Sequence, residues 1–175
     1  MIGQFLNFLD DVLLPVINDV VGPCRVLNLS ARPANEPIEP EHLAAADPGG
    51  KGGEILLLAT HWSDRRDYND RTFWTEAPWL SRASAEWLAA RKPSAVAVDF
   101  PQDYPIRLLL DGKEVPKSEH VTHDILLSNG VTLIEYVFNT SRLTAPRNLF
   151  SAAPLLIPNA DGAPARFYAI EGLPV

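Results

Sequence analysis

A histidine and a glutamate near the C-terminal third of the chain have the chemistry of metal ligands. They are His123 and Glu135, in the stretch HVTHDILLSNGVTLIEY at residues 120–136. Imidazole nitrogen and carboxylate oxygen together suit Zn²⁺ or Mn²⁺. On spacing alone a second interpretation is open, in which His123 is a core histidine bonded to backbone and Glu135 faces solvent from an edge strand.

The surrounding residues predict elements that would bring this pair together. Ser118 can cap a helix that runs to about Asn129, and Gly130 supplies a left-handed stop. The run VTLIEYV at 131–137 is then typical of a strand. Because the chain turns back at once, we expect a helical His123 and a strand-borne Glu135 around a shared centre.

The remaining segments predict a single mixed α/β domain. Apolar runs bounded by prolines and glycines indicate short strands, and two of them are apolar enough to be covered on both faces. Helices and strands alternate early, and strands gather late. Strands are expected over residues 25–29, 54–60, 95–99, 131–137, 151–158 and 166–170, and helices over 40–47, 81–92 and 118–129.

Composition narrows the function classes. The chain has 175 residues, 46% of them hydrophobic and 21% charged, which is typical of one globular domain. A net charge of −7 argues against a nucleic-acid partner. The single cysteine, Cys24, excludes an internal disulfide and a thiolate zinc site. A metal would therefore need carboxylates and some of four histidines: His42, His61, His120 and His123.

Several stretches resemble the cyclase family of metal-dependent hydrolases, which includes bacterial kynurenine formamidase and isatin hydrolase. VTHDILLSNGVTLIEYVFNTSRL has the family's histidine, leucine pair, glycine, glutamate and asparagine in order. VGPCRVLNLS, EILLLATHWSD and APLLIPNADGAPARFYAI resemble further family segments, and the similarity spans residues 12–171. The resemblance implies a cyclase-like, swivelling β/β/α-type fold with a mixed sheet, a divalent metal (Zn or Mn), and His123 and Glu135 among its ligands.

The sequence departs from the family in one large respect. The family segment His-x-Gly-Thr-His-x-Asp-x-Pro-x-His precedes the VGPA strand and supplies further ligands and the catalytic histidine, and nothing in these residues resembles it. Two hypotheses follow. The first is an N-terminally shortened hydrolase of a formamide or cyclic amide, whose incomplete metal site is finished by another chain or a longer product. The second is a catalytically degenerate homologue that serves as a binding or structural subunit. No catalytic residue is assigned.

Other residues are candidates for the pocket or for partners of the ligands. His61 ends a buried strand and replaces a family glycine, and the patch VDFPQDY follows another buried strand. Alternatively, His61 is a surface or pocket-wall histidine and the patch is a turn fixed by prolines. Aromatic residues at 62, 73, 74 and 79 could line a pocket or serve as core and interface anchors. The candidates are His61, Trp62, Asp99, Gln102, Asp103 and His120.

The N-terminal run is apolar but lacks a basic leader and is interrupted by Asp10, Asp11 and Pro15. It therefore predicts a cytoplasmic protein without a signal or membrane span. Residues 1–11 are expected to form an apolar helix or replacement segment before a cyclase-like domain at 12–175. Such a segment could cover a sheet edge or drive self-association, and we expect a homo-oligomer, most simply a two-fold dimer.

Overall fold

The computed structural model describes residues 19–155, 157 and 160–174. A six-stranded sheet has the order β6-β5-β3-β1-β7-β8, and β2 and β4 form a small second sheet. The predicted segment at 1–11 lies outside the described residues. The strands are β1 (Val21–Asn28), β2 (Pro37–Ile38), β3 (Ile55–Ala59), β4 (Trp79–Leu80), β5 (Ala95–Val98), β6 (Thr132–Ile134), β7 (Arg147–Pro154) and β8 (Ala165–Ile170).

Short helices connect these strands. The α-helices are α3 (Pro40–Ala46), α4 (Trp62–Arg65), α5 (Arg71–Thr75), α6 (Arg82–Ala90) and α7 (Ile106–Leu109). Two 3₁₀ turns, η2 (Lys117–Glu119) and η4 (Thr140–Arg142), and a π-helical turn, η3 (His123–Leu127), complete them. No helix of the described part of the chain is long and apolar enough to cross a bilayer.

The sheet is mixed, as the sequence predicts. Strands β1, β3, β5 and β6 run parallel to one another, whereas β7 pairs antiparallel with β1 and with β8. The carboxyl ends of the four parallel strands therefore meet at one edge of the sheet. In open α/β sheets this edge is where ligands bind, so it positions the candidate site.

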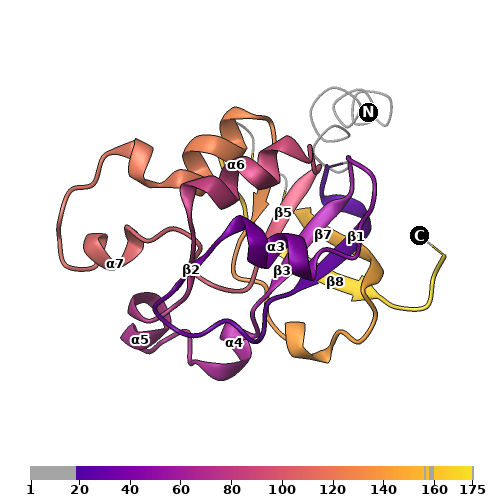
Figure 1. The fold of residues 1–175 in the computed structure, drawn as a ribbon, viewed down its shortest axis with the longest axis horizontal. Helices are drawn as coiled ribbons and strands as arrows, with labels where there is room; N and C mark the ends of the chain where they lie inside the picture. The colour runs from indigo at the N-terminus through magenta and orange to yellow at the C-terminus, as the bar shows by residue number, and fades with distance from the viewer. Residues whose placement is uncertain (1–18, 156, 158–159, 175) are drawn as a thin grey trace.

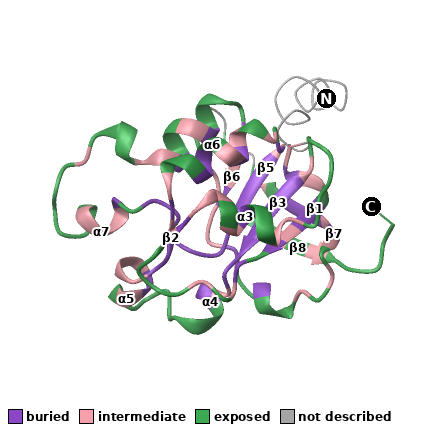
Figure 2. Cartoon of the chain, in the orientation of Figure 1, coloured by how far each residue is buried: buried purple, intermediate pink, exposed green. Residues whose placement is uncertain are grey.

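The core lies on both faces of the central strands (Figure 2), which appear there as the buried centre of the sheet. On one face, Leu56 and Leu58 of β3 pack with Leu43 of α3 and Leu88 of α6, the two helices that lie over the sheet in Figure 1. Leu57 of β3 belongs to a second cluster on the other face. A strand covered on both sides has no need of alternating polarity, which explains its continuous apolar run.

Helix α6 begins where the sequence predicts, because Ser81 caps it. The Ser81 hydroxyl accepts the Ser84 backbone N–H at 3.2 Å and donates to Glu39 Oε2 at 2.6 Å. We expect Ser81→Ala to lower the free energy of unfolding by about 1–2 kcal/mol and the melting temperature by several degrees. Thermal unfolding followed by circular dichroism measures this. Ser118→Ala is the control: its exposed side chain caps nothing, and an equal loss there would contradict the assignment.

The region around the candidate ligands differs from the prediction. The single helix expected over 118–129 is divided into η2 and η3, and Ser118 lies inside η2 rather than capping a helix. The division falls where the Thr122 backbone N–H is held by the Asp103 side chain, a tertiary contact that local propensity cannot indicate. Gly130 does adopt the left-handed conformation, with φ of 72°.

The strands near the C-terminus also have different limits. The strand expected over 131–137 ends at Ile134, so Glu135 follows the strand instead of lying in it. The cause is Tyr136, whose φ of 59° is incompatible with extended backbone. The strand expected over 151–158 is β7, which begins at Arg147 and ends at Pro154.

Candidate functional site

Four polar side chains meet at the carboxyl edge of β5 and β6. Gln102 and Asp103 lie in the loop after β5, Glu135 directly follows β6, and His123 begins η3, the turn that leads into β6. The sheet order places β5 beside β6, so these segments converge although they are distant in sequence. Tyr136 has left-handed backbone and turns the chain immediately after Glu135, so β6 does not continue beyond Ile134.

His123 is the centre of this group. Its Nδ1 lies 2.7 Å from Asp103 Oδ2, and its Nε2 lies 3.6 Å from Glu135 Oε1. The hydrogen bond to Asp103 raises the pKa of His123 above its usual value, burial opposes the rise, and the charge of Glu135 adds to it. A neutral His123 that donates from Nδ1 to Asp103 leaves Nε2 unprotonated and directed toward Glu135. The ring is thus oriented by one carboxylate and faces another.

Glu135 is held from a second side. Its Oε1 accepts a hydrogen bond from Gln102 Nε2. Gln102 is 2% exposed, and its Oε1 has no hydrogen-bond partner among the described residues. The amide orientation that donates to Glu135 is therefore fixed by the carboxylate itself, because only the NH₂ group can bond to it.

Asp99 serves a different purpose from its neighbours in the loop. It is fully buried, and its carboxylate accepts hydrogen bonds from the backbone N–H groups of Thr60 and His61 and from the hydroxyls of Thr60 and Thr140. Burial raises the pKa of Asp99, and these donors oppose the rise. The residue ties the end of β3 to the turn after β6, beside the four-residue group but without a described contact to it.

The other predicted candidates lie outside the His123 group. His61 has left-handed backbone, with φ of 58°, and donates its N–H to Asp99. Trp62 is buried in the core and donates its indole N–H to the Phe73 carbonyl. The His120 ring centroid is 6.3 Å from that of His123, edge to face, so His120 is a neighbour of the group.

An aromatic cluster begins at the residue after Glu135. Tyr136 packs edge to face against Trp74 and Tyr68, with ring centroids 5.3 and 6.0 Å away, and Phe138 joins at Tyr68. Burial raises the pKa of the Tyr136 phenol, and the Glu135 charge raises it further. Sequence reasoning missed Tyr68, Tyr136 and Phe138. The signal in the sequence is that Tyr136 and Phe138 closely follow Glu135.

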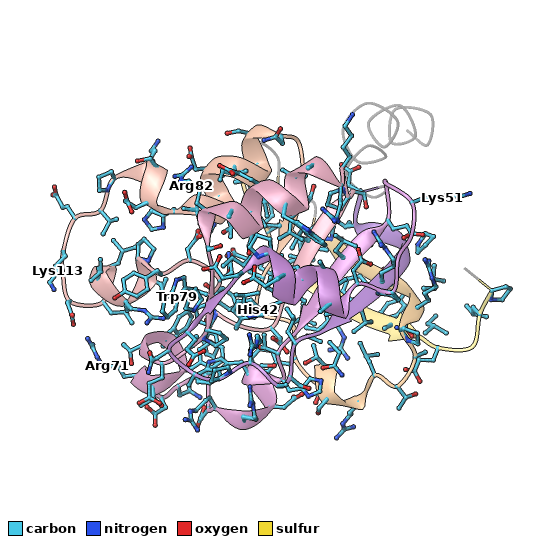
Figure 3. All side chains as sticks on the ribbon, in the orientation of Figure 1. His42, Lys51, Arg71, Trp79, Arg82 and Lys113 are labelled. Atoms are coloured by element: carbon cyan, nitrogen blue, oxygen red, sulfur yellow. The ribbon has the colours of Figure 1, made fainter. Side chains whose placement is uncertain are left out.

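Trp79, one of the aromatics that could line a pocket or anchor the core or an interface, contacts Tyr104 and the Arg107 guanidinium. Figure 3 labels it on the segment before α6.

The group contains only part of a metal site. Among the residues that the structure describes, no three or more histidine, cysteine, aspartate or glutamate side chains are gathered so that they could hold an ion. Of the four side chains, His123 presents Nε2 to Glu135 Oε1, which also accepts the hydrogen bond from Gln102. Asp103 is engaged by His123 and by the Thr122 backbone. The two predicted ligands do lie together; their role as ligands stays a prediction.

Comparison with known proteins identifies the family. The model of the Cyclase family, described as "Putative cyclase", matches residues 10–102, more than half of the chain. The chain therefore belongs to the cyclase family, as its sequence predicts. The comparison with curated proteins found no match.

Solved structures agree with this assignment. One, described as a potential metal-dependent hydrolase with cyclase activity, is 26% identical, with a TM-score of 0.69 over 93% of this chain and 71% of its own. A predicted metal-dependent hydrolase from Bacillus stearothermophilus is 27% identical, with a TM-score of 0.66 over 87% of this chain and 65% of its own.

Isatin hydrolase A from Labrenzia aggregata shares the fold at 21% identity, with a TM-score of 0.70 over 87% of this chain and 62% of its own. The chain thus has the fold of the metal-dependent hydrolases of this family, and it spans 62–71% of the length of these three proteins.

Proposed function

We propose that this chain contributes His123 and Glu135 to the divalent-metal site of a hydrolase that cleaves a formamide or a cyclic amide. The observation that supports this most is the orientation of His123: a carboxylate holds Nδ1, and Nε2 faces a second carboxylate 3.6 Å away. Histidines that bind metals almost always donate their other ring N–H to a carboxylate, a carbonyl or water.

The residues fit such an ion in chemistry and spacing. Two donor atoms that each lie about 2.0–2.2 Å from zinc are roughly 3.3–3.6 Å apart in tetrahedral geometry, and His123 Nε2 and Glu135 Oε1 have this separation. Imidazole and carboxylate accept Zn²⁺ and Mn²⁺ alike. Two ligands hold an ion weakly, so we propose that the remaining ligands come from another chain, including a second copy in a two-fold dimer, or from sequence beyond these 175 residues.

The proposed chemistry divides between the ion and the protein. A bound divalent ion lowers the pKa of a water molecule toward about 7 and polarises the substrate carbonyl. His123 would bind through Nε2, Asp103 would keep the ring proton at Nδ1, and Gln102 would keep Glu135 in place. The substrate class rests on the family resemblance and on isatin hydrolase A among the structures with this fold.

A second function is favoured by the sparseness of the ligand set. Because the described residues gather no three potential ligands, the chain could be a catalytically degenerate homologue that acts as a binding or structural subunit. This alternative predicts that the isolated chain takes up no metal.

Metal uptake by the purified chain tests whether copies of this chain complete the site by themselves. We expect the purified chain to bind Zn²⁺ or Mn²⁺ in calorimetric titration. Loss of a ligand's hydrogen-bond partner weakens metal binding about 10–100-fold. We expect His123→Ala, which removes a proposed ligand itself, to weaken binding by more than this. His120→Ala is the matched control, since it removes the neighbouring imidazole and spares the pair. Hydrolysis of isatin and of N-formylkynurenine would then be assayed with the loaded protein. A wild-type chain that neither contains metal by elemental analysis nor titrates with either ion would contradict a site completed by a second copy of this chain. It would leave completion by a different chain or by further sequence, or the binding or structural role.

A further inference from the structure

We propose that the consecutive residues Gln102 and Asp103 are positioning residues, each of which presets one of the two groups that face the proposed metal. Asp103 sets the tautomer and orientation of His123, and Gln102 sets the carboxylate of Glu135. The part of this proposal that concerns metal affinity rests on the proposed function, whereas the part that concerns the His123 tautomer does not.

Asp103 has the geometry of a fixed acceptor. Its side chain is 4% exposed, Oδ1 accepts the Thr122 backbone N–H at 2.9 Å, and Oδ2 lies 2.7 Å from His123 Nδ1. The first contact anchors the carboxylate to the residue that precedes His123, so the second contact has little freedom. Because an ionised carboxylate can only accept, a neutral His123 bonded to it carries its proton on Nδ1. Free imidazole has no such constraint. In His123, the Nε2 lone pair is available to a cation only when the proton is on Nδ1.

Gln102 has the geometry of a fixed donor. It is 2% exposed, and its backbone carbonyl accepts the Leu80 N–H at 2.9 Å, which ties this residue to β4. From that anchored position Nε2 donates to Glu135 Oε1. Glu135 follows the end of β6 and is 31% exposed in its side chain, so this bond restrains a carboxylate that would otherwise choose among rotamers.

The adjacency of the two residues gives them a joint effect. His123 and Glu135 come from different elements, η3 and the end of β6, yet one anchored dipeptide after β5 holds both. Their separation of 3.6 Å is therefore determined by the loop of β5 rather than by either ligand's own backbone alone. A site built in this way holds its two groups in place before an ion arrives, which lowers the ordering cost of binding.

The tautomer of His123 is measured in the metal-free protein by two-bond ¹H–¹⁵N correlation NMR spectra of the imidazole ring. The pH is chosen so that these spectra show His123 mainly in its neutral form. We expect the Nδ1–H form in the wild type. Asp103→Asn keeps the size of the side chain but offers an NH₂ donor to Nδ1, so we expect a shift to the Nε2–H form. The control is Asp124→Asn, which alters an exposed carboxylate next to His123 and should leave the tautomer unchanged. An Nε2–H wild type, or an Asp103→Asn variant that keeps Nδ1–H, would overturn the role of Asp103.

Zinc titration of Asp103→Asn and of Gln102→Met tests the part of the proposal that concerns metal affinity. We expect Asp103→Asn to weaken Zn²⁺ binding about 10–100-fold, and Gln102→Met to weaken it about 10-fold while His123 keeps its tautomer. Wild-type affinity in Gln102→Met would overturn the role of Gln102. If the tautomer changes as expected but the wild type does not bind Zn²⁺ or Mn²⁺, the positioning of His123 stands, and the proposed metal site fails for copies of this chain alone. The wild-type spectrum decides the tautomer even if a variant does not fold.

Discussion

Arg25→Ala should lower the free energy of unfolding by about 3–5 kcal/mol, the usual cost of breaking a buried ion pair by removing one partner. The Arg25 side chain is only 4% exposed; Nη1 lies 2.6 Å from Asp47 Oδ1, and Nε lies 2.7 Å from Glu54 Oε2. Alanine would leave both carboxylates, 12% and 15% exposed, without their shared cation. Arg147, which bonds Glu54 Oε1 at 3.0 Å, offsets part of this loss.

The surrounding backbone leaves little room for the site to adjust. A Cβ atom on Gly50 would lie 2.7 Å from Arg25 Cδ and 2.5 Å from Glu54 Oε2, so the segment before β3 passes directly over the ion pairs. The segment therefore limits how much further water can reach the two carboxylates, which are already 12% and 15% exposed. This close approach is the reason to expect a value within the range for buried pairs rather than for exposed ones.

Urea unfolding of Arg25→Ala and of Arg71→Ala provides the measurement and its control. Arg71 also pairs with a carboxylate, that of Asp111, but its side chain is 58% exposed and lies at the surface in Figure 3. Removal of Arg71 should cost about 0–1 kcal/mol, as is usual for exposed pairs. Similar losses in the two variants would show that burial of Arg25 contributes no additional stability.

Asp99→Asn should destabilise the protein by about 2–4 kcal/mol, because it places an NH₂ group against donors in a buried site. One carboxylate oxygen accepts the Thr60 N–H, and the other accepts the His61 N–H at 2.7 Å. Whichever way an asparagine amide is turned, its nitrogen faces one of these backbone N–H groups, which cannot reverse. The hydroxyls of Thr60 and Thr140 can rotate, so they add less to the cost.

Thr140→Val is the matched control for this variant. Thr140 is 1% exposed, and its hydroxyl donates to Asp99, so the substitution removes one donor while the carboxylate keeps three others. We expect a loss of about 1 kcal/mol in urea unfolding. If the Asp99→Asn variant loses no more free energy of unfolding than Thr140→Val, the buried backbone N–H groups have found other acceptors. That result would contradict the arrangement described.

Local patterns alone determined much of the fold. The continuous apolar runs at 54–60 and 95–99 predict strands covered on both faces, and β3 and β5 are such strands. Ser81, the alanines and Pro93 predict α6 to within two residues at its end, because capping and helix propensity act within a few positions. The ordered matches to the cyclase family, too, lie in the sequence, and the family model, which matches residues 10–102, confirms the family.

The tertiary structure decided how the candidate site is built. Glu135 lies outside its strand because Tyr136 is left-handed, and Ser118 caps no helix because Asp103 holds Thr122. The contacts that orient His123 and Glu135 join residues 20 and 33 positions apart. Propensity and periodicity report only on neighbours along the chain. The sequence by itself therefore determined which two residues have the chemistry of ligands, and only the packing of β5 against β6 decided that Asp103 and Gln102 would hold them.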